Sequence, residues 1–234
     1  MRRTSVFVIA LAIAAGCTKP SSPEPESAEA AQPDSDVAEA PADDAAQEEA
    51  SAVATATVGA EAPDFTLQGL SGQSVTLSEF KGKTVVLEWF NPDCPFVKYS
   101  HGEGPLKTMA ADTTAKDPDL VWLAINSGAP GEQGHGLDRN KEALKDYAMN
   151  HKVLIDESGK VGKLYNAKTT PHMFVINESG ELVYSGALDN APMGKVAGDD
   201  EVNYVKNALE SLAAGEAVEL AETRPYGCSV KYGS

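Results

Sequence analysis

The feature that most constrains the fold is a largely apolar run, residues 84–90 (TVVLEWF), which ends shortly before Cys94-Pro95. A run of this length and composition predicts a buried strand. Proline suits the first position of a helix, because its missing N–H would be unbonded there anyway. We therefore expect Cys94 at a helix N-terminus. Free N–H groups and the helix dipole favour the thiolate there, and the thiolate is the nucleophilic form of cysteine.

A second proline marks the same region of the predicted fold. Thr170-Pro171 stands at the head of an extended apolar run, residues 172–176 (HMFVI). A proline inside an extended segment is confined to special positions, and a cis X–Pro bond is a specific structural feature. Pro171 is therefore a candidate cis-proline beside an active site.

Strand and helix patterns alternate through the rest of the chain, which predicts an α/β fold with a central mixed sheet flanked by helices. Gly102, Gly104 and Pro105 interrupt the helix after Cys94, so it either kinks or splits. His151 is expected at a helix C-terminus, where the dipole favours a cation. The remaining predicted elements are a strand at 120–125, a helix from Asp138 to about Asn150, a strand at 152–156, a hairpin of 172–176 with 181–185, and a helix from 199 or 200 to Gly215 that presents Val202, Val205, Leu209 and Leu212 on one face.

The N-terminus indicates export. A basic start precedes an apolar run, Val6 to Ala15, which is too short to span a membrane and is typical of a secretory signal peptide. The small residues before Cys17 resemble a lipoprotein cleavage box, so residues 1–17 are interpreted as a signal peptide and Cys17 as the lipidated residue. The alternative is an ordinary signal peptide that leaves Cys17 free. Thr18, rather than Asp, resembles Gram-negative sorting to the outer membrane, with the protein facing the periplasm.

The segment 18–57 predicts a tether rather than a folded part. It is rich in Ala, Pro, Ser, Glu and Asp, has no aromatic residue, and holds ten acidic residues against one lysine. Such a segment cannot bury enough apolar surface to offset the entropy of ordering, and its charges repel one another and extend it. The whole chain has a net charge of −16. Nucleic acid is therefore not an expected partner.

Several motifs in order resemble the thioredoxin-fold redoxins, the superfamily of thioredoxins and peroxiredoxins. This resemblance implies a redoxin domain at 58–215 and a tail at 216–234 that carries Cys228. It also implies a redox-active Cys94, with Thr170 and Pro171 beside it. The matching segments are residues 59–67 (GAEAPDFTL), residues 75–83 (VTLSEFKGK), the strand–helix junction at Cys94, Thr170-Pro171, and residues 224–232 (RPYGCSVKY).

The chain departs from both better-known patterns. Thioredoxins have a second cysteine where this chain has Val97, so Cys94 cannot form their short-range disulfide. Peroxiredoxins have a threonine and a proline where this chain has Asn91 and Leu87. Asn91 still offers an amide that could hold a bound oxygen. The family therefore implies either a peroxide or a protein disulfide as the substrate, with an envelope thiol as the reductant and no cofactor.

The roles of the cysteines follow from their number and from the resemblance. Lipidation of Cys17 leaves Cys94 and Cys228 as an even pair in an oxidising compartment. We expect Cys94 to attack, helped by the helix end and by exposure, and Cys228 to resolve the intermediate as a disulfide. The alternative is a permanent disulfide, which would stabilise the fold by about 4–5 kcal/mol in the chain-entropy model.

Other interpretations remain open at this stage. One is thiol–disulfide exchange without peroxide chemistry. Another is a non-catalytic copper-binding module that uses Cys94, Cys228 and either His172 or His135. Glu88, inside an apolar strand, needs a partner and is a candidate for proton transfer. Asp93, next to Cys94, would oppose thiolate formation. The loops 127–137 and 188–198 are expected to overhang the cysteine.

Overall fold

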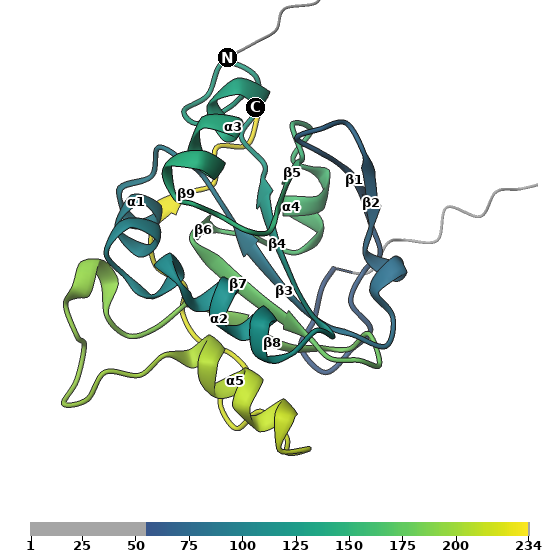
Figure 1. Ribbon diagram of the computed structural model, residues 1–234, viewed down its shortest axis with the longest axis vertical. Helices are drawn as coiled ribbons and strands as arrows, with labels where there is room; N and C mark the ends of the chain where they lie inside the picture. Colours follow the sequence, from purple (N-terminus) through teal and green to yellow (C-terminus); the bar gives the residue numbers. More distant parts are fainter. Residues whose placement is uncertain (1–54, 234) are drawn as a thin grey trace, which may run out of the picture. The chain divides into compact units, whose positions relative to one another are not determined.

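The computed structural model describes residues 55–233. The predicted signal peptide, most of the predicted tether and Cys17 therefore lie outside the described residues. The described chain forms a seven-stranded sheet in the order β2-β1-β5-β4-β3-β7-β8 and a separate two-stranded sheet, β6-β9. Helices cover the large sheet (Figure 1), so the predicted α/β architecture with a central mixed sheet is confirmed. No helix within residues 55–233 is long and apolar enough to cross a membrane.

The bounds of the strands are as follows. They run β1 Thr66–Gly69, β2 Ser74–Thr76, β3 Thr84–Trp89, β4 Leu120–Asn126, β5 Lys152–Ile155, β6 Thr169–Thr170, β7 His172–Ile176, β8 Leu182–Gly186 and β9 Cys228–Ser229. The helices are α1 Pro95–Gly102, α2 Met109–Lys116, α3 Leu137–Asp146, α4 Lys160–Leu164 and α5 Tyr204–Ala213, with short 3-10 turns η1 Leu77–Phe80, η2 Pro105–Lys107 and η3 Pro192–Gly194.

Strand β3 lies inside the large sheet, between β4 and β7, and is buried along its whole length. It pairs in parallel with β4 and antiparallel with β7. Its side chains alternate between the two faces. Val85, Leu87 and Trp89 join one apolar cluster, whereas Val86 joins the other, with Met173. The near-continuous apolar run in the sequence therefore reflects a strand that is covered on both faces.

The helix after Cys94 splits into α1, η2 and α2, which is one of the two expected outcomes, and Pro105 opens the middle turn. Two other predicted helices differ from the observed ones. Asp138 does not cap α3, because the helix begins at Leu137 after Gly136, whose φ of +97° suits glycine. That helix ends at Asp146, and Ala148 adopts a positive φ. Helix α5 starts later than expected, because Asn203 caps it by accepting a hydrogen bond from the Lys206 N–H at 2.9 Å.

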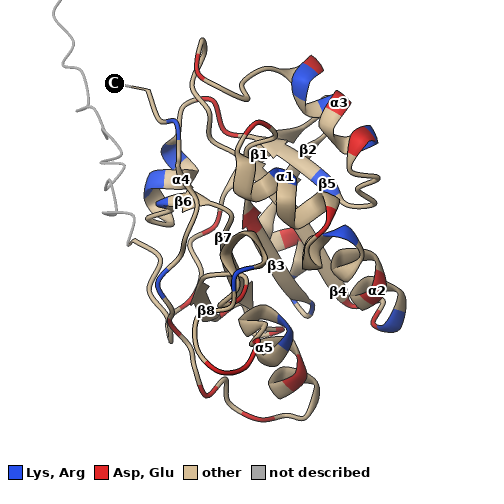
Figure 2. Cartoon of the chain, turned by 90° about the vertical axis from the view of Figure 1, so that its left-hand side faces the viewer, with Lys and Arg blue, Asp and Glu red and all other residues tan. Residues whose placement is uncertain are grey.

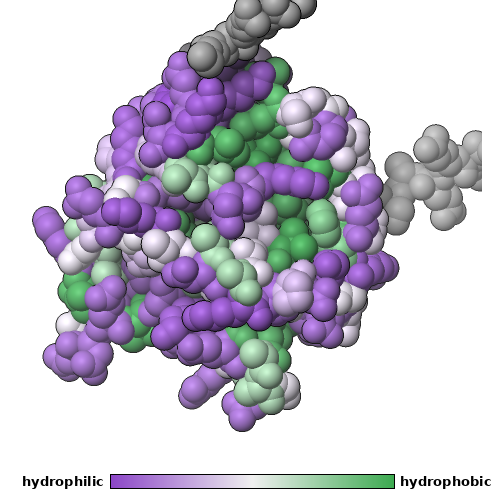
Figure 3. Space-filling view, in the orientation of Figure 1, coloured by the Kyte–Doolittle hydropathy of each residue, from purple (hydrophilic) through white to green (hydrophobic). Residues whose placement is uncertain are grey.

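The surface carries charges of both signs close together. Figure 2 shows basic and acidic residues interspersed along α2, α3 and α5. On the face seen in Figure 3, hydrophilic residues cover most of the surface and hydrophobic ones show between them. In the view of Figure 2, the described residues show no continuous run of basic residues of the kind that binds a phosphate backbone.

Candidate active site

The register of the central strands places the active-site cysteine. Trp89, at the end of β3, lies opposite His172, at the start of β7. The five residues after Trp89 lead to Cys94, and the residues just before His172 are Thr170 and Pro171. The antiparallel pairing therefore brings Cys94 and Thr170 together from distant parts of the chain.

Cys94 occupies the N-cap position of α1, and Pro95 begins the helix. The predicted placement at a helix N-terminus is therefore confirmed. The Cys94 thiol donates a hydrogen bond to the Thr170 carbonyl at 3.0 Å. The peptide bond between Thr170 and Pro171 is cis, as the sequence predicted.

The C-terminal tail supplies the second sulfur. Strand β9 pairs antiparallel with β6, with Cys228 opposite Thr170 (Figure 1). The two cysteines are free thiols, and Cys94 Sγ lies 2.7 Å from Cys228 Sγ. A disulfide bond is about 2.05 Å long, so the sulfurs need to approach by well under 1 Å to bond. The pairing of Cys94 with Cys228 stays a prediction, and this geometry places it within reach.

One expectation about Cys94 is wrong. Its side chain was expected to be exposed, but none of its surface is accessible to solvent. It packs against Phe90 and Val97, with Phe96 and Cys228 at the edge of the same cluster. Cys228 is only partly buried. Burial, together with its contact with Cys94, raises the pKa of Cys228 to about 11.

Asn91 shapes the loop that precedes Cys94. Its side-chain amide donates to the Gln133 carbonyl at 3.0 Å, and its side-chain oxygen accepts from the Asp93 N–H at 2.9 Å. Gly134 lies so close that an added Cβ would overlap the Asn91 side chain. Both polar ends of Asn91 are thus engaged in holding the loop, and a contact with a bound oxygen stays a prediction.

The carboxylate of Asp93 is paired with a cation from a distant part of the chain. Arg139, on α3, donates to Asp93 Oδ1 from Nε at 3.0 Å and lies 2.9 Å from it through Nη2. Tyr147 donates its hydroxyl to the Pro92 carbonyl at 2.9 Å. The expected opposition of Asp93 to the thiolate is therefore offset by an ion pair. No local motif marks Arg139, because its partner lies 46 residues away.

Glu88 has the partner that its burial requires. Its Oε1 lies 2.8 Å from His101 Nε2, and both side chains are almost fully buried. His101 lies on α1, the helix that Cys94 caps, and stacks on Tyr147 with ring centroids 5.3 Å apart. The other oxygen, Oε2, has no hydrogen-bond partner. A role of Glu88 in proton transfer remains a prediction.

Two of the other three histidines have hydrogen-bond partners. His172 Nδ1 accepts from the Lys168 N–H at 3.2 Å, and His135 pairs with Glu157 at 3.0 Å. His151 is not at a helix end as expected, because α3 stops five residues earlier. Within residues 55–233 no group of three or more His, Cys, Asp or Glu is arranged to hold a metal ion. The proposed copper site with His172 or His135 is not assembled here.

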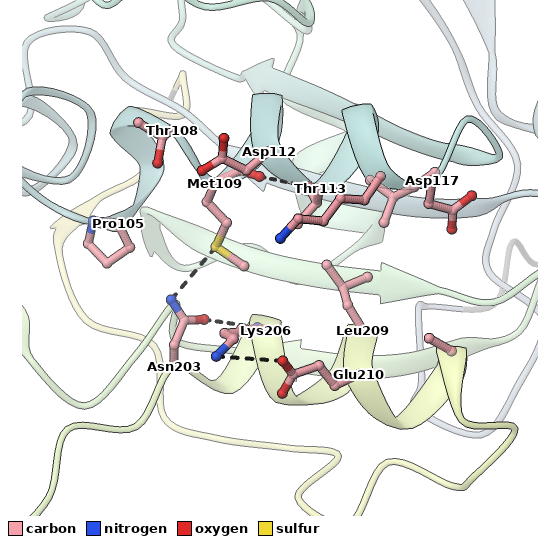
Figure 4. Close-up of a pocket in the computed structure, with 13 residues that line it drawn as sticks. Pro105, Thr108, Met109, Asp112, Thr113, Asp117, Asn203, Lys206, Leu209 and Glu210 are labelled. Atoms are coloured by element: carbon pink, nitrogen blue, oxygen red, sulfur yellow. Dashed lines mark hydrogen bonds and ion pairs between the residues drawn. The ribbon is translucent and has the colours of Figure 1, made fainter.

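A separate cavity of about 410 Å³ lies between α2 and α5 (Figure 4). Met109, Leu120 and Leu209 form its apolar part. On α5, Lys206 and Glu210 form an ion pair one helical turn apart, with Nζ 3.5 Å from Oε1. Neither cysteine of the pair lines this cavity, so it does not belong to the cysteine site.

Comparison with known proteins identifies the family. The Redoxin family model matches residues 57–204. The chain belongs to the Redoxin family. Membership gives it a thioredoxin-like fold and thiol-based redox chemistry. A comparison with curated proteins finds no match.

Two solved structures resemble this redoxin along most of their length. A hypothetical protein from Sinorhizobium meliloti is 29% identical, with a TM-score of 0.65, over 77% of this chain and 97% of that one. An uncharacterized conserved protein from Geobacillus kaustophilus is 28% identical, with a TM-score of 0.65, over 76% of this chain and 93% of that one. Both support the fold, and neither title names an activity.

Proposed function

We propose that this redoxin is a thiol–disulfide oxidoreductase whose Cys94 and Cys228 cycle between a dithiol and a disulfide. The observation that carries the proposal is the 2.7 Å separation of the two sulfurs beside the cis-proline. In the oxidising half-reaction, the dithiol passes two electrons and two protons to the substrate as the Cys94–Cys228 bond forms. A substrate disulfide thereby becomes two thiols, hydrogen peroxide becomes two waters, and an alkyl hydroperoxide becomes water and an alcohol.

The same observation bears on the alternative of a permanent structural disulfide. The segments that carry the two cysteines are held together by backbone pairing of β6 with β9 and by the hydrogen bond from Cys94 to Thr170. These contacts position the tail in addition to any bond between the two sulfurs. A pair that is aligned in the reduced state can close and open without refolding the tail, as a cycling pair must.

The test counts the thiol released when the reduced protein reacts with a small disulfide. The protein carries Cys17→Ser, so that only the cysteines of the pair can react. A cycling pair then releases two thiols per chain, and at most one when Cys94→Ser or Cys228→Ser is added, since one sulfur alone stops at the mixed disulfide. A parallel reaction with hydrogen peroxide shows which oxidant the pair reduces. If the protein with both cysteines of the pair also releases no more than one thiol per chain, the proposed function is wrong.

The compartment is part of the proposal. A disulfide cycle suits an oxidising environment outside the cytosol, where thiol pairs are oxidised and re-reduced. The exported, lipid-anchored location predicted from Cys17 would place the redoxin at the periplasmic side of a membrane. A dedicated envelope thiol would then act as reductant.

A further inference from the structure

The segment that carries Cys228 is fastened to the domain on both sides of that residue. On one side, the Tyr226 hydroxyl donates to Asp189, and the Tyr226 ring lies 5.9 Å from that of Phe96. On the other side, the Val230 N–H donates to the Lys168 carbonyl at 3.1 Å, and the Tyr232 hydroxyl donates to the Ala167 carbonyl at 2.8 Å. We call residues 226–232 the strap.

The strap lies against Thr170, the residue that precedes the cis-proline Pro171. Gly227 has a φ of +134°, and a Cβ added there would lie 2.2 Å from the Thr170 carbonyl oxygen. Only glycine suits both the backbone conformation and the contact. The Ala129 N–H also donates to the Lys231 carbonyl at 2.9 Å. Lifting the strap would therefore break several hydrogen bonds and expose apolar surface.

The strap covers one sulfur and presents the other. Cys94 has no solvent-accessible surface and lies beneath Cys228, whereas Cys228 is partly exposed and Ser229, beside it, is exposed. A thiolate that approaches from solvent thus meets Cys228 first. A thiolate of the size of glutathione would reach Cys94 only if the strap moved.

We propose that external thiols reduce the Cys94–Cys228 disulfide by attacking Cys228, so that the mixed disulfide forms on the strap and Cys94 leaves. The proposal rests on the proposed function, because it requires that the disulfide form. It assigns opposite roles to the two sulfurs. Cys94 is the internal sulfur at the helix end, and Cys228 is the sulfur that meets the reductant.

The chemistry of the two sulfurs favours this direction. A reductant thiolate bonds to Cys228 Sγ, and the Cys94–Cys228 bond breaks with its electron pair on Cys94. The leaving thiolate is then at the N-terminus of α1, where the helix dipole favours negative charge. A better leaving thiolate leaves faster. A second reductant thiolate then attacks the sulfur that the first reductant molecule contributed to the mixed disulfide. This step releases the oxidised reductant and the Cys228 thiolate, which takes a proton from solvent.

The experiment uses the full chain with Cys17→Ser, so that only the two cysteines of the pair remain. The protein is oxidised, and peptide mapping first establishes that the Cys94–Cys228 disulfide is present. Glutathione is then added, and the reaction is stopped early with acid and an alkylating agent. We expect glutathione on Cys228 and the alkyl group on Cys94. Glutathione found mainly on Cys94 would overturn the proposal and leave the proposed function intact.

Tyr232→Phe provides a second readout, because it removes one fastening of the strap and leaves both sulfurs in place. Attack at Cys228 needs no lifting of the strap, so the rate with glutathione should change less than about twofold. An increase of fivefold or more would mean that the reductant waits for the strap to open, which contradicts the proposal. Failure to find any disulfide in the mapping step refutes the proposed function, and this proposal with it.

Discussion

Arg139 contacts the carboxylate of the residue that precedes the buried cysteine, with its Nη2 2.9 Å from Asp93 Oδ1. The same guanidinium donates to the Pro92 carbonyl at 3.3 Å. Helix α3 therefore fastens the loop that leads to Cys94 and neutralises a charge at its side. The ion pair thus offsets the charge of the acidic residue next to Cys94.

Arg139→Gln should loosen this loop and leave the Asp93 charge without its main partner. Because both side chains are about three-quarters buried, we expect a loss of about 1 kcal/mol in the free energy of unfolding. Disulfide formation should slow severalfold. Urea unfolding and the rate of oxidation by a small disulfide measure the two effects. Glu142→Gln is the matched control, because Glu142 is exposed and its contact with Arg139, at 4.0 Å, is weak. If Glu142→Gln lowered stability and slowed oxidation as much as Arg139→Gln, the pairing with Asp93 would have no specific role.

The buried pair of Glu88 and His101 predicts strongly non-additive substitutions. His101→Phe would leave the buried carboxyl group of Glu88 with no partner for either oxygen, and we expect a cost of about 3 kcal/mol in the free energy of unfolding. Glu88→Leu combined with His101→Phe should recover much of that loss, because an apolar pair replaces the polar one. Urea unfolding of both single variants and the double variant tests this. Strictly additive costs would mean that the pair does not act as a unit.

The elements that position the site could be predicted because each is marked by a local sequence pattern. The strand β3, the helix start at Cys94 and the turn at Pro171 each depend on a few adjacent residues. The split after α1 was predicted from Gly102, Gly104 and Pro105 for the same reason. The late start of α5 was missed because Asn203, rather than one of the acidic residues before it, caps the helix.

The parts that were missed depend on contacts between distant segments. Arg139 reaches Asp93 across 46 positions, and His101 reaches Glu88 only because α1 packs on β3. The burial of Cys94 depends on a strap that ends the chain. A cysteine at a helix N-terminus suggests exposure by itself, but the pairing of β9 with β6 covers it. None of these three contacts can be predicted from a single stretch of sequence.

Burial of His151 predicts a loss of stability in acid. Its ring nitrogens have no hydrogen-bond partner, and desolvation lowers its pKa to about 4, with a smaller opposing effect of Glu88. The native state therefore binds fewer protons than the unfolded state below about pH 6.5. The stability that depends on neutral His151 is therefore fully present above about pH 6.5 and is lost as the pH falls towards 4. The expected contribution is up to about 3 kcal/mol.

His151→Phe should flatten this part of the pH dependence. Urea unfolding of both proteins between pH 7 and pH 4.5 is the measurement. Some dependence should remain in the variant, because burial also lowers the pKa of His172, to about 3, in the same direction. Parallel stability curves for the wild type and the variant would show that His151 does not contribute.

The predicted lipid anchor can be tested separately from the redox site. Cys17 lies outside the described residues, so its lipidation is a prediction from the sequence alone. Cys17→Ser should move the protein from the membrane fraction to the soluble fraction, because the variant lacks the cysteine that would carry the acyl chains. Stable attachment to a membrane needs more than one such chain. Cell fractionation and mass analysis of the N-terminal peptide are the measurements. A variant that stays with the membrane would show that another part of the chain attaches it.

The last prediction separates the roles of Cys94 and Cys228 towards a small oxidant. Hydrogen peroxide converts a thiolate to a sulfenic acid and releases hydroxide, and a second thiol then closes the disulfide with loss of water. Cys94 lies at the N-terminus of α1, whereas burial and its neighbour raise the pKa of Cys228 to about 11. In Cys228→Ser, we therefore expect a sulfenic acid to accumulate on Cys94. In Cys94→Ser, oxidation should be at least tenfold slower than in the wild type. A sulfenic-acid trap followed by peptide mapping reads both outcomes, and trapping on Cys228 at the wild-type rate would reverse the assignment.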